Sequence, residues 1–306
     1  KHTFIPKFSP FKFATMKNLY ITIICTVLML SELKSQNVLT EDFIFAPSDS
    51  LENLGDWYRT GINTAYNIKV VAPGLVYTGY AGSGHGNTSY INNSGNGDSV
   101  FKYFSTPITS GTAYLAFMMR IDKLPSTVIL GNCIGFNPNT GGTNHNTSLY
   151  IKRLSDTTFD LGVQKVSGFN TVYTNMVFDL DKTYLVVLKY SIINGIDNDN
   201  SSLYVFENAV PAAEPSMAMA ETIAGSDFTG QASIFLDNNY AQNGLNGIGI
   251  KIDGIRVGTT WATSVLSAGL STTYENSENN ILHQNYPNPF QQETNIKYRI
   301  PQKGFV

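Results

Sequence analysis

A hydrophobic alternation of period two runs through most of this chain and constrains its fold more than any other feature. In "TYLVVLKYSII" (residues 183–193), alternate residues beginning at Tyr184 point one way, and those from Leu185 to Lys189 point the other way. Both sides are mostly apolar, which predicts a strand in the middle of a sheet. The strand "SLYVFEN" follows after a connection rich in Gly, Asn and Asp, which are turn-forming residues.

The same pattern recurs between residues 38 and 261, and Gly, Pro, Asn, Asp or Ser bound each run. The runs are "VLTEDFIF", "IKVVAPGLVYTGY", "SVFKYFS", "AYLAFMMRI", "TVILGNCIGF", "SLYIKRL", "FDLGVQKV", "ASIFLDNN" and "IGIKIDGIRVG". We predict an all-β fold, a single antiparallel β-sandwich of the jelly-roll kind over residues 37–262, with about eleven or twelve short strands. The only helix candidate, "AAEPSMAMAETIA", is weakened by Pro215.

Composition agrees with a β-rich extracellular protein. Hydrophobic residues make up 42% of the 306 residues, enough for a core, and charged residues only 14%. The net charge is −3 and no basic run occurs, so the sequence excludes an electrostatic footprint for nucleic acid. Of the two cysteines, Cys25 lies in an apolar N-terminal run and Cys133 in "VILGNCIGF". We expect Cys133 to be a buried, inert thiol with no disulfide partner.

The N-terminal region has the order of a secretory signal peptide. Residues 1–15 precede the first plausible initiator, Met16, and are interpreted as upstream translation outside the mature protein. Residues 16–35 follow with one Lys, an apolar stretch predicted as a signal helix, and a small residue, Ser35. The apolar stretch is too short to span a bilayer comfortably. Cleavage after Ser35 would remove it and leave no membrane span. These features predict a secreted or outer-cell-surface protein.

Two resemblances rest on the later strands. The segments "YLVVLKY", "DNDNSSLYVF" and "IKIDGIRVGTTW", in this order, resemble the concanavalin-type, laminin-G-like sandwich. They also resemble a domain of secreted Bacteroidetes-type proteins for which no settled activity is known. The first resemblance implies a concanavalin-like β-sandwich, in which bound Ca²⁺ is frequent.

The C-terminal segment predicts a sorting signal. Residues 263–281 are polar, without either period, and are interpreted as a linker. Residues 282–306, "LHQNYPNPFQQETNIKYRIPQKGFV", resemble the start of the type A sorting domain of type IX secretion cargo. The residues that carry this motif are Tyr286, Pro287, Asn288, Pro289 and Phe290. The resemblance implies the type IX secretion machinery as a partner. It also implies further strands, so we expect this domain to be truncated at Val306.

The sequence contains no catalytic constellation that we recognise. The Ser83 and His85 of "GSGHG" do not form G-x-S-x-G, and no helix follows them. No E-x-D-x-E pattern supplies the paired carboxylates of a sandwich glycosidase. His85 and His145 both lie in loop-like segments, and solvated loop histidines are favoured over a metal pair. We therefore predict a protein that is not an enzyme, and keep open a hydrolase whose carboxylates converge only in three dimensions.

Candidate binding residues surround the Gly-rich loop. Exposed aromatic rings stack on sugars, and Tyr77, Tyr80 and Tyr90 flank "GSGHG" with its His85. For Trp57, core packing is the favoured interpretation. The predicted glycan-binding set is Tyr77, Tyr80, His85 and Tyr90.

A cation site is the second candidate. Asp197 and Asp199 of "IDNDN" offer the hard oxygen ligands that Ca²⁺ prefers, although such residues also form plain turns. Asp237 with its following asparagines poses the same choice. Ca²⁺ is thus the only cofactor considered, and a plain turn is the favoured alternative.

Taken together, these features predict an exported, non-catalytic binding or adhesion module, with a glycan as the candidate ligand. Two alternatives stay open: a secreted glycan-active hydrolase, and a spacer domain of a larger surface protein.

Overall fold

The structure is a computed structural model, and the part of it described below belongs to the first of two compact units, Lys1–Ser267 and Ala268–Val306. It describes residues 37–52, 54–61, 67–92, 99–125, 130–138, 144–237 and 247–266. Within these ranges, no helix is long and apolar enough to cross a membrane. The predicted signal helix, the linker and the sorting segment with Tyr286–Phe290 lie outside the described residues.

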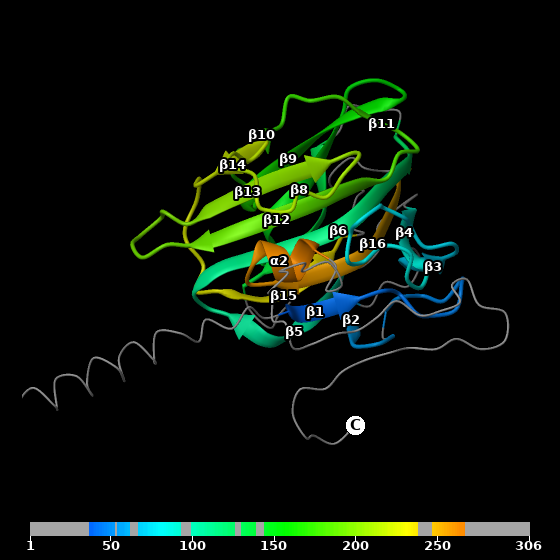
Figure 1. Ribbon diagram of the computed structural model, residues 1–306, viewed down its shortest axis with the longest axis horizontal. Coiled ribbons are helices and arrows are strands. Elements are labelled where there is room, and N and C mark those ends of the chain that lie inside the picture. The colour runs from blue at the N-terminus through cyan, green and yellow to red at the C-terminus, as the bar shows by residue number, and fades with distance from the viewer. Residues whose placement is uncertain are drawn as a thin grey trace, which may run out of the picture. The chain divides into compact units, whose positions relative to one another are not determined.

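Two antiparallel sheets face each other in the sandwich (Figure 1). The first, sheet A, has the order β14-β13-β12-β6-β16-β4-β3, and β1 pairs with β16 off this path. Its strands are β14 (Ala220–Thr222), β13 (Asn200–Phe206), β12 (Tyr184–Ile192), β6 (Gly111–Lys123), β16 (Gly249–Gly258), β4 (Thr88–Asn92), β3 (Lys69–Val71) and β1 (Asn37–Glu41). The apolar β12 lies between β13 and β6, so the prediction of an interior strand is confirmed.

The second, sheet B, has the order β10-β9-β8-β7-β15-β5-β2, and β11 pairs with β9. Its strands are β10 (Val172–Tyr173), β9 (Thr158–Val166), β8 (Asn146–Arg153), β7 (Leu130–Asn137), β15 (Gln231–Leu236), β5 (Val100–Ile108), β2 (Trp57–Arg59) and β11 (Phe178–Asp179). Consecutive strands such as β7, β8 and β9 pair as neighbours, whereas β15 inserts between β7 and β5. Around β15 the chain passes from β14 in sheet A to β15 in sheet B and back to β16 in sheet A, and such passages join the two sheets into one domain.

The main core lies between the sheets and follows from the alternation. On β6, Leu115, Phe117 and Met119 belong to this core and are fully buried. On β12, the inward set includes Val186 and Leu188, which are also fully buried. Cys133 is buried among the same residues and is a free cysteine, and burial raises its pKa. The prediction of a buried thiol is confirmed.

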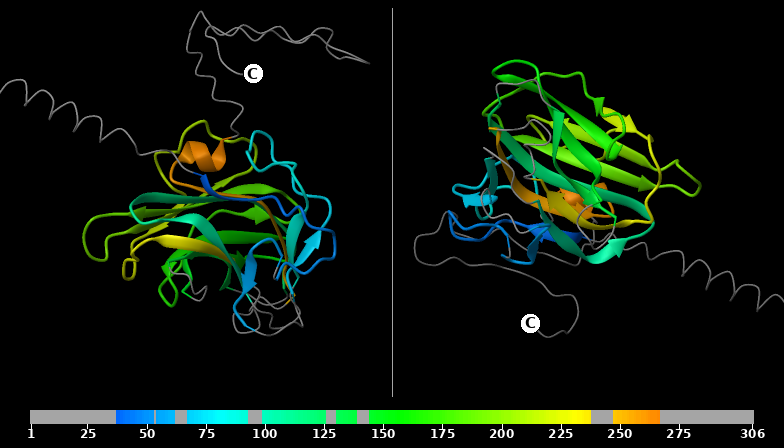
Figure 2. Two further views of the ribbon diagram at one scale, coloured as in Figure 1. Left: turned by 90° about the horizontal axis from the view of Figure 1, so that it is seen from below. Right: turned by 180° about the vertical axis from the view of Figure 1, so that it is seen from behind.

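A second, smaller apolar cluster covers the outward face of sheet A. Its residues from the strands alternate with the core residues, as Tyr114 on β6 and Leu185 on β12 do. Helix α2 (Trp261–Val265) lies over them on the outside of the sandwich (Figure 2). The Trp261 ring meets the rings of Tyr114 and Tyr204 edge-on, with centroids 6.2 and 5.6 Å apart. This cover explains why both faces of β12 are apolar.

The predicted all-β fold, a single antiparallel β-sandwich, is confirmed, with two corrections of detail. The described residues form sixteen strands, more than predicted, because strands as short as β10 and β11 carry no readable alternation. The helix candidate at residues 212–224 is not helical: Ala220–Thr222 forms β14, and the residues before it form a loop. Pro215 and the pairing of β14 with β13 override the Ala-rich composition.

Candidate functional site

The tyrosines of the Gly-rich loop are anchors of the fold rather than open rings. Tyr77 is 5% exposed and its hydroxyl donates to the Ala209 carbonyl at 3.2 Å. Tyr80 is 4% exposed and its hydroxyl donates to the Gly254 carbonyl at 2.6 Å. Burial raises the pKa of Tyr77 to about 12 and that of Tyr80 further. The expected exposure of these two rings is therefore wrong, because the loop folds back onto the outer cluster of sheet A.

The other two predicted binding residues lie nearer the surface. His85 is exposed in the loop before β4. Tyr90 on β4 is half-buried, and the ammonium of Lys251 lies 5.9 Å from its ring centroid. No contact in the described residues brings His85 and Tyr90 together with the two buried tyrosines around one cavity. A sugar-binding role for His85 and Tyr90 stays a prediction.

The Asp197–Asp199 turn is held by hydrogen bonds of its own. Asp199 is 1% exposed, and its two carboxylate oxygens accept from the Tyr190 hydroxyl at 2.5 Å and the Ile193 amide at 2.6 Å. Asp197 is exposed and has a φ of 55°, a left-handed conformation that Asp tolerates in turns. No group of three or more metal-ligating side chains occurs among the described residues. The calcium site stays a prediction, and the hydrogen bonds of Asp199 account for that carboxylate without a cation.

A polar pocket opens on the same outward face of sheet A. The register of the strands builds its floor, because directly paired residues share a face. Ser202 on β13 pairs with Lys189 on β12 on one side and with Glu221 on β14 on the other. Asn200 pairs in the same way with Ser191. All of these residues line a cavity of about 320 Å³.

The loop between β13 and β14 forms the wall of this pocket. Residues 214–218 of the loop line the cavity. Its course is fixed at three points, one on the preceding strand β13 and two from distant parts of the chain. The Trp261 indole donates to the Pro211 carbonyl at 3.0 Å, and the Met219 amide donates to the Leu203 carbonyl at 2.9 Å. The third anchor is the Tyr77 hydroxyl described above.

Glu214 is the most strongly held side chain of the wall. Its Oε1 accepts from Lys189 Nζ and from the Tyr204 hydroxyl, each at 2.6 Å. Its Oε2 accepts from the Tyr114 hydroxyl at 2.5 Å. Burial acts to raise the pKa of Glu214, but the three hydrogen bonds outweigh burial and leave that pKa lowered. Glu214 is therefore ionised at neutral pH.

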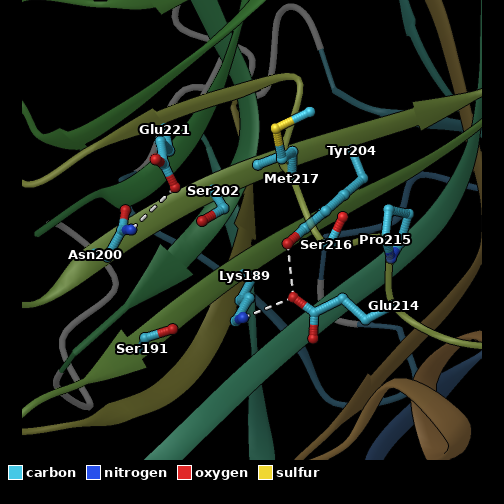
Figure 3. A pocket seen from close by; sticks show the side chains of 11 residues that line it. Lys189, Ser191, Asn200, Ser202, Tyr204, Glu214, Pro215, Ser216, Met217 and Glu221 are labelled. Atoms are coloured by element: carbon cyan, nitrogen blue, oxygen red, sulfur yellow. Dashed lines mark hydrogen bonds and ion pairs between the residues drawn. The ribbon is translucent and has the colours of Figure 1, made fainter.

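Figure 3 shows how the polar groups divide between the two ends of the pocket. At one end Glu214 faces Lys189 and Tyr204. At the other end Asn200 Nδ2 donates to Glu221 Oε2 at 3.2 Å, and Ser202 lies between the two ends. The lining thus carries donors and acceptors on the strands, and its apolar part comes from Tyr204 and the loop residues Pro215, Met217 and Ala218. Such a site suits a small ligand with many hydroxyl or amine groups rather than a flat apolar one.

Sequence reasoning missed this pocket. The alternation places Lys189 on the outward face, but the partners across the strands depend on register. The sequence signal nearest to the wall is the Glu214–Pro215 pair in the segment first considered as a helix.

Comparison with known proteins adds no family. No family model matches the chain, and no curated protein matches it. Solved structures with a similar arrangement include the T. cruzi calreticulin globular domain, 10% identical with a TM-score of 0.43, over 73% of this chain and 88% of that one. The Emp47p carbohydrate recognition domain is 9% identical with a TM-score of 0.37, over 74% and 97%. The binding domain of botulinum neurotoxin DC in complex with SialylT is 12% identical with a TM-score of 0.37, over 65% and 44%. The proposals below rest on this chain's own residues.

Proposed function

We propose that this protein is a non-catalytic binding module whose outer pocket on sheet A holds a saccharide. The observation that carries the proposal is the mixed lining of the pocket, in which Lys189, Ser202 and Glu221 lie in one cross-strand row. Sugar hydroxyls both donate and accept, so they pair with such a lining on every side. A volume of about 320 Å³ is at the lower end of ligand pockets, about 300–1,000 Å³, and suits a short saccharide.

The test is a glycan array followed by titration calorimetry, each with Ca²⁺ and with chelator. Ser202→Leu fills the floor of the pocket and is expected to abolish binding. Thr106→Leu, at an exposed position on β5 of the other sheet, is the matched control and should bind as the parent protein does. Absence of binding to any glycan under both conditions contradicts the saccharide proposal. Equal binding by the two variants would move the site away from this pocket.

A glycan-active hydrolase is the second candidate, because two carboxylates, Glu214 and Glu221, line one pocket. A general acid needs a raised pKa, whereas the pKa of Glu214 is lowered by its hydrogen bonds despite burial. This favours binding over hydrolysis. Incubation with the glycans that bind, followed by chromatography of the products, distinguishes the two, since any product whose release is lost in Glu214→Gln supports the hydrolase.

The proposed setting of this module is outside the cell, in the secreted fraction or on the outer surface. The support is the signal-like segment at residues 16–35 and the sorting motif at Tyr286–Phe290. The type IX secretion machinery is the proposed partner. Expression in a host with that machinery, followed by N-terminal sequencing, should give a mature protein that begins at Gln36. A protein that keeps residues 16–35 and stays in the cytoplasm contradicts this setting. The alternative role, a spacer domain of a larger surface protein, predicts instead that the isolated domain binds no ligand.

A further inference from the structure

The charges of the pocket are unevenly compensated. Lys189 and Glu214 form an ion pair of 2.6 Å, and the Lys189 ammonium also lies 5.7 Å from the centroid of the Tyr114 ring. The one cation of the lining is therefore already engaged by Glu214. Glu221 is the remaining charge, so the lining as a whole carries a net negative charge.

Among the residues that the structure describes, Glu221 has no cationic partner. Its side chain is exposed, it accepts one hydrogen bond from Asn200 Nδ2, and no ion pair to it occurs in the described part of the chain. The amide Oδ1 of Asn200 is enclosed and has no hydrogen-bond partner among these residues. This end of the pocket thus offers the exposed Glu221 carboxylate as an acceptor, with Asn200 Nδ2 as its one donor among the described residues.

The field of Glu221 extends into the pocket. Burial and the hydrogen bond to Glu214 are the main causes that raise the pKa of Tyr204, and Glu221 adds to the same direction. Ser202, 4% exposed, lies directly between Lys189 and Glu221 in the strand register. A ligand resting on Ser202 would therefore meet the engaged Lys189–Glu214 pair on one side and an uncompensated carboxylate on the other.

An ammonium group complements that carboxylate end. It carries a positive charge and three N–H donors, and no acceptor that would repel a carboxylate or an amide oxygen. A neutral hydroxyl meets the same groups without the charge, and an N-acetyl group is neutral, keeps a single N–H donor and adds a bulky acetyl with a carbonyl acceptor. From these contacts we infer that the saccharide held by the pocket is an amino sugar with a free amine, and that the amine binds at Glu221. This inference rests on the proposed function and specifies its ligand.

The alternative occupant with the same chemistry is a lysine-rich peptide. The pocket favours the sugar, because it offers further polar groups beyond the amine site: the hydroxyls of Ser191 and Ser202 and the ammonium of Lys189. These groups can pair with sugar hydroxyls, whereas a lysine side chain would leave them unpaired. The two occupants are separated by the experiment rather than by the charge alone.

The experiment is titration calorimetry of the full chain with three tetrasaccharides of one linkage: β-1,4-glucosamine, its N-acetylated form and the neutral glucose form. It is run at about pH 6, where an aliphatic amine is protonated. We expect the glucosamine tetramer to bind about tenfold more tightly than the other two, the scale of one hydrogen bond to a charged group. Glu221→Gln should remove this preference and keep the weaker binding. Asp56→Asn, an exposed position beside β2, removes the same charge elsewhere and should keep the preference.

Each outcome separates this inference from the proposed function. Equal affinities for the three tetramers, or a preference that survives Glu221→Gln, overturn the amino-sugar inference and leave saccharide binding standing. Binding to none of the three in any variant overturns the amino-sugar inference, and the proposed function falls with it only where the glycan array also finds no ligand. A lysine tetrapeptide that binds as tightly as the glucosamine tetramer overturns the sugar part of the inference. Unfolding midpoints of the variants, measured in urea, verify that Glu221→Gln is folded.

Discussion

Asp253 should make the free energy of unfolding of this protein depend on pH, and replacing Asp253 tests whether burial has raised the pKa of its side chain. The side chain is fully buried at a bulge of β16, where its oxygens accept from the Leu75 and Gly254 amides, each at 2.6 Å. Burial raises the pKa of Asp253 from 3.8 to about 7, against the two hydrogen bonds. The nearby Asp42 carboxylate raises it as well, while Arg256 lowers it.

The sign follows from which state binds the proton more tightly. The folded state does, so this group's contribution is most favourable below the ordinary pKa of 3.8 and is lost as pH rises to about 7. Each tenfold change in proton affinity is worth about 1.4 kcal/mol, so the free energy of unfolding should fall by up to roughly 4 kcal/mol over this range. Above it, no further change comes from Asp253.

The assay is urea unfolding at closely spaced pH values, followed by tryptophan fluorescence, for the parent protein and Asp253→Asn. Asn stays neutral, and its amide nitrogen faces one of the two N–H donors, so the variant should be about 1–3 kcal/mol less stable at low pH. As pH rises this difference should shrink or reverse. Glu52, whose pKa burial also raises, affects both proteins equally and cancels. A difference that stays constant from acid to alkaline pH would refute the assignment.

Three further predictions concern buried groups. Trp261→Ala should lower the free energy of unfolding by about 3–5 kcal/mol, because its ring fills the cover of sheet A; chemical denaturation measures this, and a loss below about 1 kcal/mol contradicts it. Lys165→Met should cost about 1–3 kcal/mol, since the fully buried ammonium pairs with Asp227 at 2.6 Å and donates to the Ile223 and Gly225 carbonyls, which lose their donor; the readout is again the urea midpoint, and an unchanged midpoint would mean that these contacts are dispensable. Ca²⁺ should leave Tm unchanged relative to EGTA, because the Asp199 oxygens are engaged by Tyr190 and a backbone amide; a rise in Tm with Ca²⁺ would restore the predicted calcium site.

The alternation along β12 was readable because it is a local property. Residues two apart share a face of any strand, so the burial of Val186 and Leu188 follows from sequence alone. The apolar outward residues, Leu185 and Val187, predict a strand in the middle of a sheet, and β12 lies there, between β13 and β6. Helix α2 was not foreseen, since five residues are too few to show a helical period.

The binding residues were harder to place because exposure is not local. Tyr77 and Tyr80 lie in a Gly-rich loop, which is typical of an exposed segment. Their hydroxyls nevertheless donate to the carbonyls of Ala209 and Gly254, far along the chain. The Asp197–Asp199 turn is local in part, since Asp199 accepts from the Ile193 amide as turn residues do. Its amides at Asn198 and Asp199 also donate to the Asp227 carboxylate, a contact between distant residues that the turn pattern does not predict.

Strand formation, the apolar side of each strand and the positions of the turns depend on residues a few positions apart, so the amino-acid order is enough to predict them. Which outward faces are covered and where a pocket opens depend on the folded arrangement. That pocket exists because β12, β13 and β14 pair in one register and because distant anchors such as Trp261 hold a loop over them. Register and loop closure are set by contacts between segments far apart in the chain, and no local pattern encodes them.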